Sequence, residues 1–444
     1  MLTFQDFEHE GRGLIPRVIS EHRASELYQT AMIADEYDRQ RNTTICNYVQ
    51  TLFSLTGSRV VDFTATNSRI ASNFFNRLNT QRCAYSLGNG VAFADDEEGR
   101  VKAALGPAFD KQLSDCAYNA LIHGLTFGFW DVDRLYNFPV TEFAPLWDEN
   151  TGRLRAGVRF WRLGPDKPVT ATLYEEDGYT TLTGKDYGAL EVAEEKRGYR
   201  QLIRMNQADG ARVVGYENYG SLPVVPFWGS RLHQSTLVGL REAIDSYDLI
   251  RSGFANDLSD CAQVYWLLEN YGGMDDTQLK RFRDRLKFQH IAVADTNDGG
   301  KVTPYTQEIP YEAREAYLKH IREGIYEDFG ALDVHTISAA STNDHIDAAY
   351  QPMDEQADLF EYQCAEFIQQ ICRLNGIEDA QPLFKRTRIS NQTEQTEMVL
   401  SAAQYLDTRT ILKLLPFVTV DQIDTILENL DREEGRRLSD GEQA

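Results

Sequence analysis

Residues 344–374 read DHIDAAYQPMDEQADLFEYQCAEFIQQICRL, and the spacing of their apolar side chains predicts one long helix. The apolar residues follow one another at alternating intervals of four and three: Ile346, Tyr350, Met353, Ala357, Phe360, Cys364, Phe367 and Ile371. This repeat of about 3.5 residues is typical of a helix packed along its whole length against another helix. Pro352 lies inside the pattern, so we expect either a kink there or the first turn of the main part of the helix.

The same helix lies in a stretch of the chain that has no basic residue. No Lys or Arg occurs between Arg322 and Arg373, and the fifty residues between them hold eleven acids: Glu323, Glu327, Asp328, Asp333, Asp344, Asp347, Asp354, Glu355, Asp358, Glu361 and Glu366. Ordinary helices alternate their charges, because like charges on neighbouring turns repel. Two interpretations stay open. One face packs while the other forms a surface meant to be negative, or the acids are simply a solvated face.

The composition of the whole chain is acidic. Its 444 residues include 45 Lys and Arg against 68 Asp and Glu, which gives a formal net charge of −23. Such a chain is a poor candidate for wrapping nucleic acid, because phosphate binding depends mainly on Lys and Arg. A hydrophobic content of 42% argues against wholesale disorder. No run of about eighteen apolar residues occurs, so no membrane-spanning helix is expected.

The N-terminal sequence and the cysteines favour an intracellular product. The first residues, MLTFQDFEHEGRG, carry acids where a signal peptide would carry bases, so secretion by that route is not expected. The six cysteines form no CxxC pair and are interpreted as reduced, mostly buried thiols: Cys46, Cys83, Cys116, Cys261, Cys364 and Cys372. Cys364 and Cys372 are about two helical turns apart, so we expect them to face one apolar seam.

The remaining pattern indicates an α+β chain that is rich in helix. Helices are expected over 24–40, 67–78, 115–123, 311–329, 394–406, 408–415 and 420–436, and a turn and strand over 85–93. Residues 124–133 alternate like a half-buried strand, and 153–227 contain short strands broken by turns. The two prolines of SLPVVPFWG (221–229) are expected to end the sheet and form a linker. Ser235 is expected to cap the helix that follows.

A basic island interrupts the acidic chain. Five bases fall within eight residues: Lys280, Arg281, Arg283, Arg285 and Lys287. A solvated helix face or salt bridges between subunits would account for them. The alternatives are a docking site for an acidic partner and a contact to nucleic acid.

The motifs of common enzymes are missing from the sequence. The Gly-Lys pairs at 184–185 and 300–301 do not continue into a phosphate loop, and neither HExxH nor Gly-x-Ser-x-Gly occurs. LGNG (87–90) is interpreted as a hairpin turn. Asp131-Val-Asp133 and Asp344-His-Ile-Asp347 could bind a divalent cation, but turn chemistry and a helix N-terminus explain them better. We therefore expect no catalytic residue, no metal and no cofactor. Two alternative functions stay open: a metal-dependent hydrolase that uses Asp131 and Asp133, and a generic oligomeric scaffold.

Several segments together resemble the portal proteins of tailed bacteriophages, in the branch typical of long-tailed phages. NSRIASNFFNRLNTQRCAYSLGNGVAF (67–93) resembles the early helix of that family, with the turn and strand that follow it. ALIHGLTFGFWDVD (120–133) and FAPLWDENTGRLRAGVRFW (143–161) are similar to the sheet of the wing domain. LPVVPFWGS (222–230) and the helix after it resemble the linker and first stem helix, and LFKRTRISNQTEQTEMVLSAA (383–403) resembles the segment after the long inner helix.

The resemblance implies a fold and domain boundaries. It implies an α/β wing at 1–234, with 375–392 as a candidate return to it, and a first stem helix at 235–260. A small α/β clip at 261–309, a second stem helix at 310–329 and a tunnel loop at 330–343 follow. The long kinked inner helix would occupy 344–374 and a helical crown 375–444. That crown is short for the family.

The resemblance also implies partners and site residues. Portals are rings, generally of twelve subunits, that replace one pentamer of the capsid. Double-stranded DNA enters through the ring under the terminase large subunit and later leaves through it, without sequence specificity. The head–tail adaptor, the major capsid protein and scaffold would be further partners. The location would be the virion, after assembly in the bacterial cytoplasm, with no membrane.

Three sets of residues receive roles from this comparison. The inner helix would line the channel with Asp344, Asp347, Asp354, Glu355, Asp358 and Glu361, so that phosphates meet no cation and DNA can slide. The tunnel loop would place these residues near the duplex: His335, Thr336, Ser338, Ser341, Thr342 and Asn343. The basic island, Lys280 to Lys287, would lie in the clip and dock the terminase or the adaptor.

Overall fold

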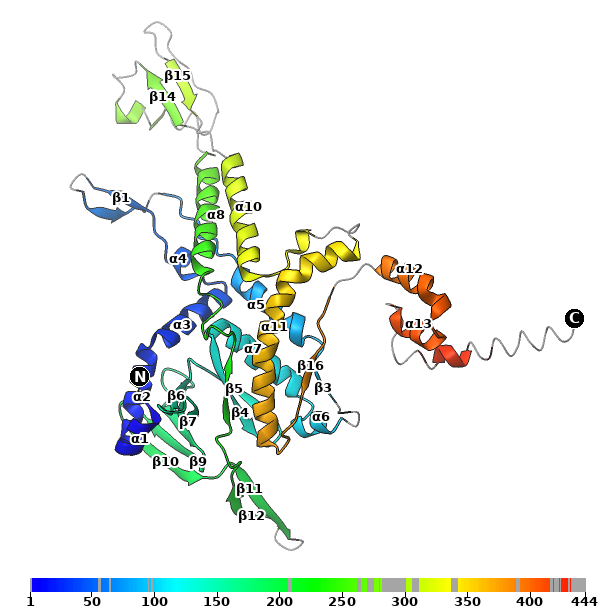
Figure 1. Cartoon of the computed structure of the whole chain (residues 1–444). Helices are drawn as coiled ribbons and strands as arrows, with labels where there is room; N and C mark the ends of the chain where they lie inside the picture. Colours follow the sequence, from blue (N-terminus) through cyan, green and yellow to red (C-terminus); the bar gives the residue numbers. More distant parts are fainter. Residues whose placement is uncertain are drawn as a thin grey trace, which may run out of the picture. The chain divides into compact units, whose positions relative to one another are not determined.

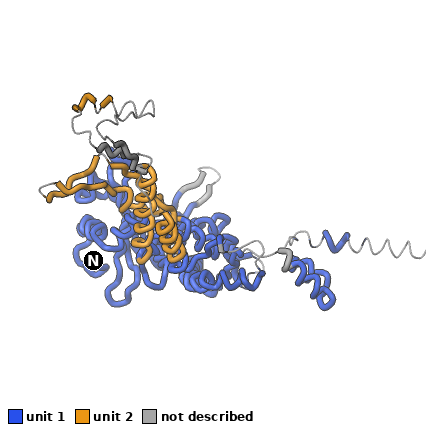
Figure 2. Tube along the Cα trace, turned by 90° about the horizontal axis from the view of Figure 1, so that it is seen from above, with its two compact units in different colours: residues 1–35, 77–238, 326–444 blue, residues 36–76, 239–325 orange. Residues whose placement is uncertain are grey.

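The computed structural model describes most of the chain. The described residues are 2–54, 57–63, 65–94, 96, 99–206, 210–261, 265–269, 275–278, 280–281, 301–305, 311–336, 342–388, 392–415, 418, 423, 425–429 and 432. The chain divides into two compact units, coloured separately in Figure 2. Unit 1 consists of residues 1–35, 77–238 and 326–444, and unit 2 consists of 36–76 and 239–325. Both units combine helices and sheets, which confirms the predicted α+β class.

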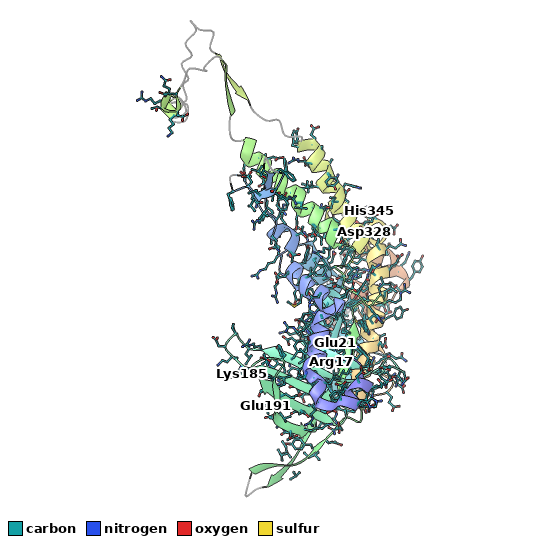
Figure 3. The ribbon with its side chains drawn as sticks, turned by 90° about the vertical axis from the view of Figure 1, so that its left-hand side faces the viewer. Arg17, Glu21, Lys185, Glu191, Asp328 and His345 are labelled. Atoms are coloured by element: carbon teal, nitrogen blue, oxygen red, sulfur yellow. The ribbon has the colours of Figure 1, made fainter. Side chains whose placement is uncertain are left out.

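A five-stranded antiparallel sheet is the largest sheet of unit 1. Its order is β10-β9-β8-β7-β6, from Leu190–Arg197, Gly178–Gly184, Val169–Glu175, Leu154–Arg162 and Phe143–Trp147. Three N-terminal elements cover one face: α1 (Phe4–Glu10), η1 (Gly11–Leu14) and α2 (Ile15–Ala24). Leu14, Ile15 and Val158 are buried between them. On α2, Arg17 and Glu21 form an ion pair at 3.3 Å (Figure 3). The predicted β-rich region is confirmed.

A three-stranded sheet forms the second layer, in the order β13-β4-β5. Its strands are Val224–Trp228, Leu125–Asp131 and Arg134–Pro139, and α7 (Phe109–His123) packs on it. The prediction that the prolines of 221–229 end the sheet was wrong, because β13 pairs with β4 with Pro226 opposite Phe127. Proline is tolerated there because β13 is an edge strand, whose outward side needs no N–H donor.

Helix α11 (Asn343–Leu374) is the long helix that the apolar spacing predicted. All eight residues of that spacing are buried, and Cys364 and Cys372 lie in the same core cluster. Phe367 stacks on Phe227 with the ring centroids 4.4 Å apart. A Cβ on Gly128 would lie 2.4 Å from Phe367 Cζ, so only glycine allows this approach of helix and sheet. Pro352 lies inside the helix, and Figure 1 shows a bend in its N-terminal part.

Helix α5 (Phe74–Leu87) begins and ends later than predicted. Residues 67–73 are not helical, and the helix continues into the stretch that we expected to form a turn. LGNG therefore connects a helix to strand β3 (Val91–Phe93) and is not a hairpin turn. Gly90 has φ +72°, which explains why the connection needs glycine there. Strand β3 pairs with β16 (Pro382–Phe384), and α6 is Arg100–Leu105.

Unit 2 is built around α8 (Arg241–Cys261) and α10 (Tyr311–Phe329). The last residues of α10, from Tyr326, belong to unit 1. The two helices lie side by side in Figure 1, and Arg314 forms an ion pair with Asp257. Ser235 does not cap α8, because this helix starts six residues later and the Ser235 hydroxyl accepts from the amide of Leu237 instead. Unit 2 also holds the strand pairs β1–β2 (Thr51–Phe53 and Arg59–Val61) and β14–β15 (Tyr265–Glu269 and Lys301–Tyr305).

An extended segment of unit 2 is fixed to α8 through alternate backbone amides. Those of Ser68, Ile70 and Ser72 donate to Asn256, Ser252 and Asp248, at 2.7, 3.0 and 2.9 Å. Alternate strand residues advance about as far as one helical turn, so the two repeats match. The prediction of a helix from residue 67 was wrong because these polar side chains of α8 bind the segment in extended form.

The remaining elements are short. They are α3 (Glu26–Asp38), α4 (Thr43–Cys46), β11 (Arg200–Asn206), β12 (Gly210–Glu217), η3 (Val334–Thr336), α12 (Gln392–Ala402), η4 (Ala403–Tyr405) and α13 (Thr408–Leu414). Helices α3, α12 and α13 agree with predicted helices. The helix predicted over 420–436 lies largely outside the described residues.

Candidate functional site

Four of the six acids assigned to the inner helix lie on one flank of α11 and are bound by arginines. Asp347, Asp354, Asp358 and Glu361 are spaced by seven, four and three residues, which places them on one side of the helix. Arg386 and Arg388, which follow β16, form ion pairs with all four. We call these six residues and Tyr85 the arginine–carboxylate cluster.

Arg386 is the more fully bonded of the two arginines. Its Nε donates to Glu361 Oε1 at 3.0 Å, and one Nη donates to Asp354 Oδ1 at 3.0 Å. The other Nη donates to Glu361 Oε2 at 2.9 Å and to Asp358. The fork of the guanidinium thus holds Glu361 through both oxygens, which is the strong geometry for this pair. Hydrogen bonding to Glu361 raises the pKa of Arg386, so its charge is fixed.

Arg388 and Tyr85 bind the same carboxylate, Asp354. Arg388 donates to Asp354, and to Asp347 Oδ1 at 3.1 Å, while its Nε donates to the Tyr85 hydroxyl at 3.0 Å. Tyr85 donates in turn to Asp354 Oδ1 at 2.6 Å, and its ring stacks on Tyr350 at 5.6 Å. Burial alone would raise the pKa of Asp354, but the hydrogen bonds from Tyr85 and Arg388 lower it below its ordinary value.

Backbone contacts explain how the two arginines reach α11. Strand β16 pairs with β3, and the chain continues so that the amide of Thr387 donates to the carbonyl of Tyr85 at 3.0 Å. Arg386 and Arg388 are two residues apart, so an extended chain points both to the same side. Sequence reasoning missed the two arginines because they lie outside the base-free stretch, which ends before Arg373. The Arg-Thr-Arg alternation directly after a short strand was the available signal.

The other two predicted acids, Asp344 and Glu355, lie outside the cluster. Both are exposed, and within the described part of the chain neither forms an ion pair. Glu355 accepts a hydrogen bond from Gln351 at 3.5 Å, and Asp344 lies in the first turn of α11, where the helix dipole favours an acid. The idea of a helix surface with no cation nearby therefore applies to Asp344 and Glu355, but not to the four acids that the arginines bind.

The loop before α11 is described in part. His335 and Thr336 belong to η3, and the His335 amide donates to Asp333 Oδ1 at 3.1 Å. Thr342 caps α11 by accepting from the amide of His345, a residue marked in Figure 3, and Asn343 begins the helix. Asp344-His-Ile-Asp347 is thus a helix N-terminus, as interpreted. Ser338 and Ser341 lie outside the described residues.

The basic island is described only at its start. Lys280 and Arg281 are exposed and helical, whereas Arg283, Arg285 and Lys287 lie outside the described residues. The alternatives for the island therefore stay open: a solvated face, salt bridges between subunits, a docking site for an acidic partner or a contact to nucleic acid.

Asp131 and Asp133 form a turn, as interpreted from the sequence. Asp131 ends β4 opposite Arg134, which begins β5, and the Asp133 amide donates to the Asp131 carbonyl at 2.7 Å. Burial raises the pKa of Asp131, with the neighbouring Asp133 adding to the effect. Among the described residues, no group of three or more His, Cys, Asp or Glu side chains could hold a metal ion. Nor does any described helix have the length and apolarity needed to cross a membrane.

The comparisons with known proteins identify the class of this chain. It belongs to the phage portal proteins, a family of structural components of the virion. The matching family model is described as "Phage portal protein, SPP1 Gp6-like" and covers residues 19–436. The portal protein of Bacillus phage SPP1 is 24% identical over 414 residues, which are 86% of this chain and 78% of that relative. The portal protein of Clostridium phage phiCD119 is 26% identical over 378 residues, 79% of this chain and 82% of that relative. The resemblance seen in the sequence is confirmed.

Proposed function

We propose that copies of this chain form a ring at one vertex of the capsid. Double-stranded DNA is packaged through the ring by the terminase and later ejected through it, and the head–tail adaptor docks on it. The observation that carries this proposal is the family match over residues 19–436, nearly the whole chain. Within it, residues 1–234 form the wing, α8 and α10 the stem, 261–309 the clip, 330–343 the tunnel loop, α11 the channel-side helix and 375–444 the crown.

In this proposal α11 gives the channel a negative wall. The arginine–carboxylate cluster holds twice as many carboxylates as guanidinium groups, and the guanidiniums already donate to those carboxylates. A phosphate would have to displace a carboxylate to bind either arginine, and exposed Asp344 and Glu355 add further repulsion. DNA can then pass close to the wall without binding to it.

The test of the ring is its mass and its image. The chain has a mass of 50.6 kDa, so twelve copies with closed symmetry form a particle of ~0.6 MDa. Native mass spectrometry should find that particle, and negative-stain microscopy should find a ring with a central hole. A protein that stays at the monomer mass under all assembly conditions contradicts the proposal.

The test of the negative wall uses the acids outside the cluster. Asp344→Lys with Glu355→Lys should stall packaging while leaving the ring intact, because the new ammonium groups attract phosphate. Asp354, Asp358 and Glu361 are unsuitable targets, since lysine there would also break the bonds to Arg386. Glu191→Lys is the matched control, an exposed acid on β10. Packaging yields equal to the control would refute the negative wall.

Docking of partners is assigned to the basic island. Lys280→Ser with Arg281→Ser should weaken binding of the terminase or adaptor more than it weakens ring formation. Loss of the ring with normal docking would instead favour salt bridges between subunits.

A further inference from the structure

The β1–β2 hairpin of unit 2 exposes an unusually large apolar surface. Seven apolar residues in and beside the two strands are each more than a third exposed, with Phe53 at 75% and Phe63 at 91%. We call these seven residues the hairpin patch: Tyr48, Val49, Leu52, Phe53, Val60, Val61 and Phe63. Leu52 lies opposite Val60, and Phe53 opposite Arg59, so apolar side chains emerge on both faces. Figure 1 shows β1 projecting away from α8 and α10, and Figure 2 shows the same projection from above. A lone two-stranded hairpin is marginally stable in water, so burial of this patch against another surface would stabilise the hairpin.

The base of the hairpin is held firmly. The Asp62 amide donates to the Gln50 carbonyl at 2.9 Å, and Asn67 Nδ2 donates to the Tyr48 carbonyl at 3.2 Å. The segment after it is fixed to α8 by the alternate amides of residues 68, 70 and 72. The patch is therefore presented in one orientation, which reduces the entropy that a partner must offset on binding.

The size of the patch matches a stable interface. From their exposed fractions, the seven side chains offer on the order of 700 Å² of apolar surface, close to the ~800 Å² that each partner contributes to a stable complex. Apolar patches exposed by monomers are usually smaller than this total, which is divided between the two faces of the hairpin.

Charge favours a second copy of this chain as the partner. Each copy carries a net charge of −23, so two copies repel unless they meet where acids are scarce. Residues 42–68 contain one acid, Asp62, and one base, Arg59. Both are engaged at the hairpin, since Arg59 Nε donates to Thr51 Oγ1 at 3.0 Å and Asp62 accepts from the Ala65 amide at 3.2 Å. A second copy can therefore contact this neutral stretch without bringing another acid-rich surface close to its own.

We propose that the hairpin patch docks onto a neighbouring copy of this chain. The inference rests on the proposed ring and names one of its contacts. In a ring, each contact joins two different surfaces of neighbouring copies, so the patch meets a region other than itself. Phe53 and Phe63 anchor the contact, because large exposed aromatic side chains gain most from burial.

Photo-cross-linking in the purified full-length ring tests the contact directly. Phe53 or Phe63 is replaced by photoreactive benzoylphenylalanine, and Leu163, an equally exposed residue after β7, serves as the control position. We expect covalent dimers from positions 53 and 63 and few from 163. Intact rings of the family mass without dimers from 53 or 63 would overturn the hairpin contact and leave the ring standing. A chain that remains monomeric and gives no dimers overturns both proposals.

A second measurement separates docking from folding. Phe53→Ser with Phe63→Ser should raise the subunit concentration at which half the rings dissociate by about tenfold or more, as expected for anchors of an interface. Leu163→Ser with Leu232→Ser removes comparably exposed side chains outside the hairpin. Protection of the amides of residues 68, 70 and 72 from hydrogen exchange reports that the base is still folded. Unchanged dissociation, or cross-links to the capsid protein in infected cells in place of dimers, contradicts the proposal.

Discussion

Helices α11 and α8 both bind an extended segment through aspartates, but they do so by different physical means. On α11, Asp354 has a side chain that is 21% exposed and lies between two arginines and a tyrosine. On α8, Asp248 is fully buried and is bound by an amide side chain and a backbone N–H. The partly exposed carboxylate on α11 is thus bound by cations, whereas the buried one on α8 is bound by uncharged donors.

The difference appears in the pKa values. Hydrogen bonds from Tyr85 and Arg388 outweigh burial and lower the pKa of Asp354. Burial raises the pKa of Asp248, and its hydrogen bonds to Asn42 and Ser72 do not offset that cost. The α11 cluster therefore favours the ionised carboxylate, and the α8 site favours the neutral one. Variants at the two sites should accordingly behave differently.

Asp248→Ala should have the largest effect. It leaves the Ser72 amide without its acceptor in the interior and Asn42 Nδ2 with only the Ser72 carbonyl, which lowers the free energy of unfolding by about 3 kcal/mol. Hydrogen exchange should show loss of protection at residues 68, 70 and 72, with the Thr387 amide beside α11 unchanged. Glu242→Ala, an exposed acid on the same helix, is the control. Equal loosening at both sites would show that the two sites are not independent.

The sequence predicted one of these helices well and the other only in outline. The seam of α11 was predictable because burial repeats every 3.5 residues, although its N-terminal half lies in one core cluster and its C-terminal half in another. The arginine–carboxylate cluster was not, because Tyr85, Asp354 and Arg386 are distant in sequence and meet only through the pairing of β3 with β16. The segment at 67–73 was expected to be helical from its local apolar spacing. Its amides bind α8 instead, which is a tertiary effect that no local pattern contains.

Arg386→Met should have the next largest effect and lower the free energy of unfolding by about 2 kcal/mol. Methionine keeps much of the apolar length, but Asp354, Asp358 and Glu361 lose their shared cation and repel one another. The Thr387 amide should exchange faster, while residues 68, 70 and 72 remain protected. Arg373→Met, at the exposed end of α11, is the control. A variant as stable as this control would show that the cluster contributes little to the fold.

Tyr85→Phe should cost about 1 kcal/mol, because it removes one hydroxyl and keeps the stacked ring. That hydroxyl donates to Asp354 and accepts from Arg388, so its loss weakens two bonds. The denaturation midpoint should fall less than in Arg386→Met. Tyr136→Phe, which removes a hydroxyl from a half-exposed ring on β5, is the control. A loss as large as that of Arg386→Met would mean that Tyr85, and not the arginine, organises the cluster.

Lowering the pH should have the smallest effect on stability. It should weaken the α11 site and strengthen the α8 site. Because the pKa of Asp354 is lowered in the fold, its contribution is present above the unfolded value of 3.8 and is lost as the pH falls through the folded value. Because the pKa of Asp248 is raised, its contribution is fully present below 3.8 and is lost as the pH rises through the folded value. On acidification towards and below 3.8, intrinsic-rate-corrected hydrogen exchange should show the Thr387 amide losing protection and the Ser72 amide gaining it. Asp354→Asn and Asp248→Asn should each remove the pH dependence at their own site only. If both amides lose protection together in the parent chain, the two carboxylates are not held by different means.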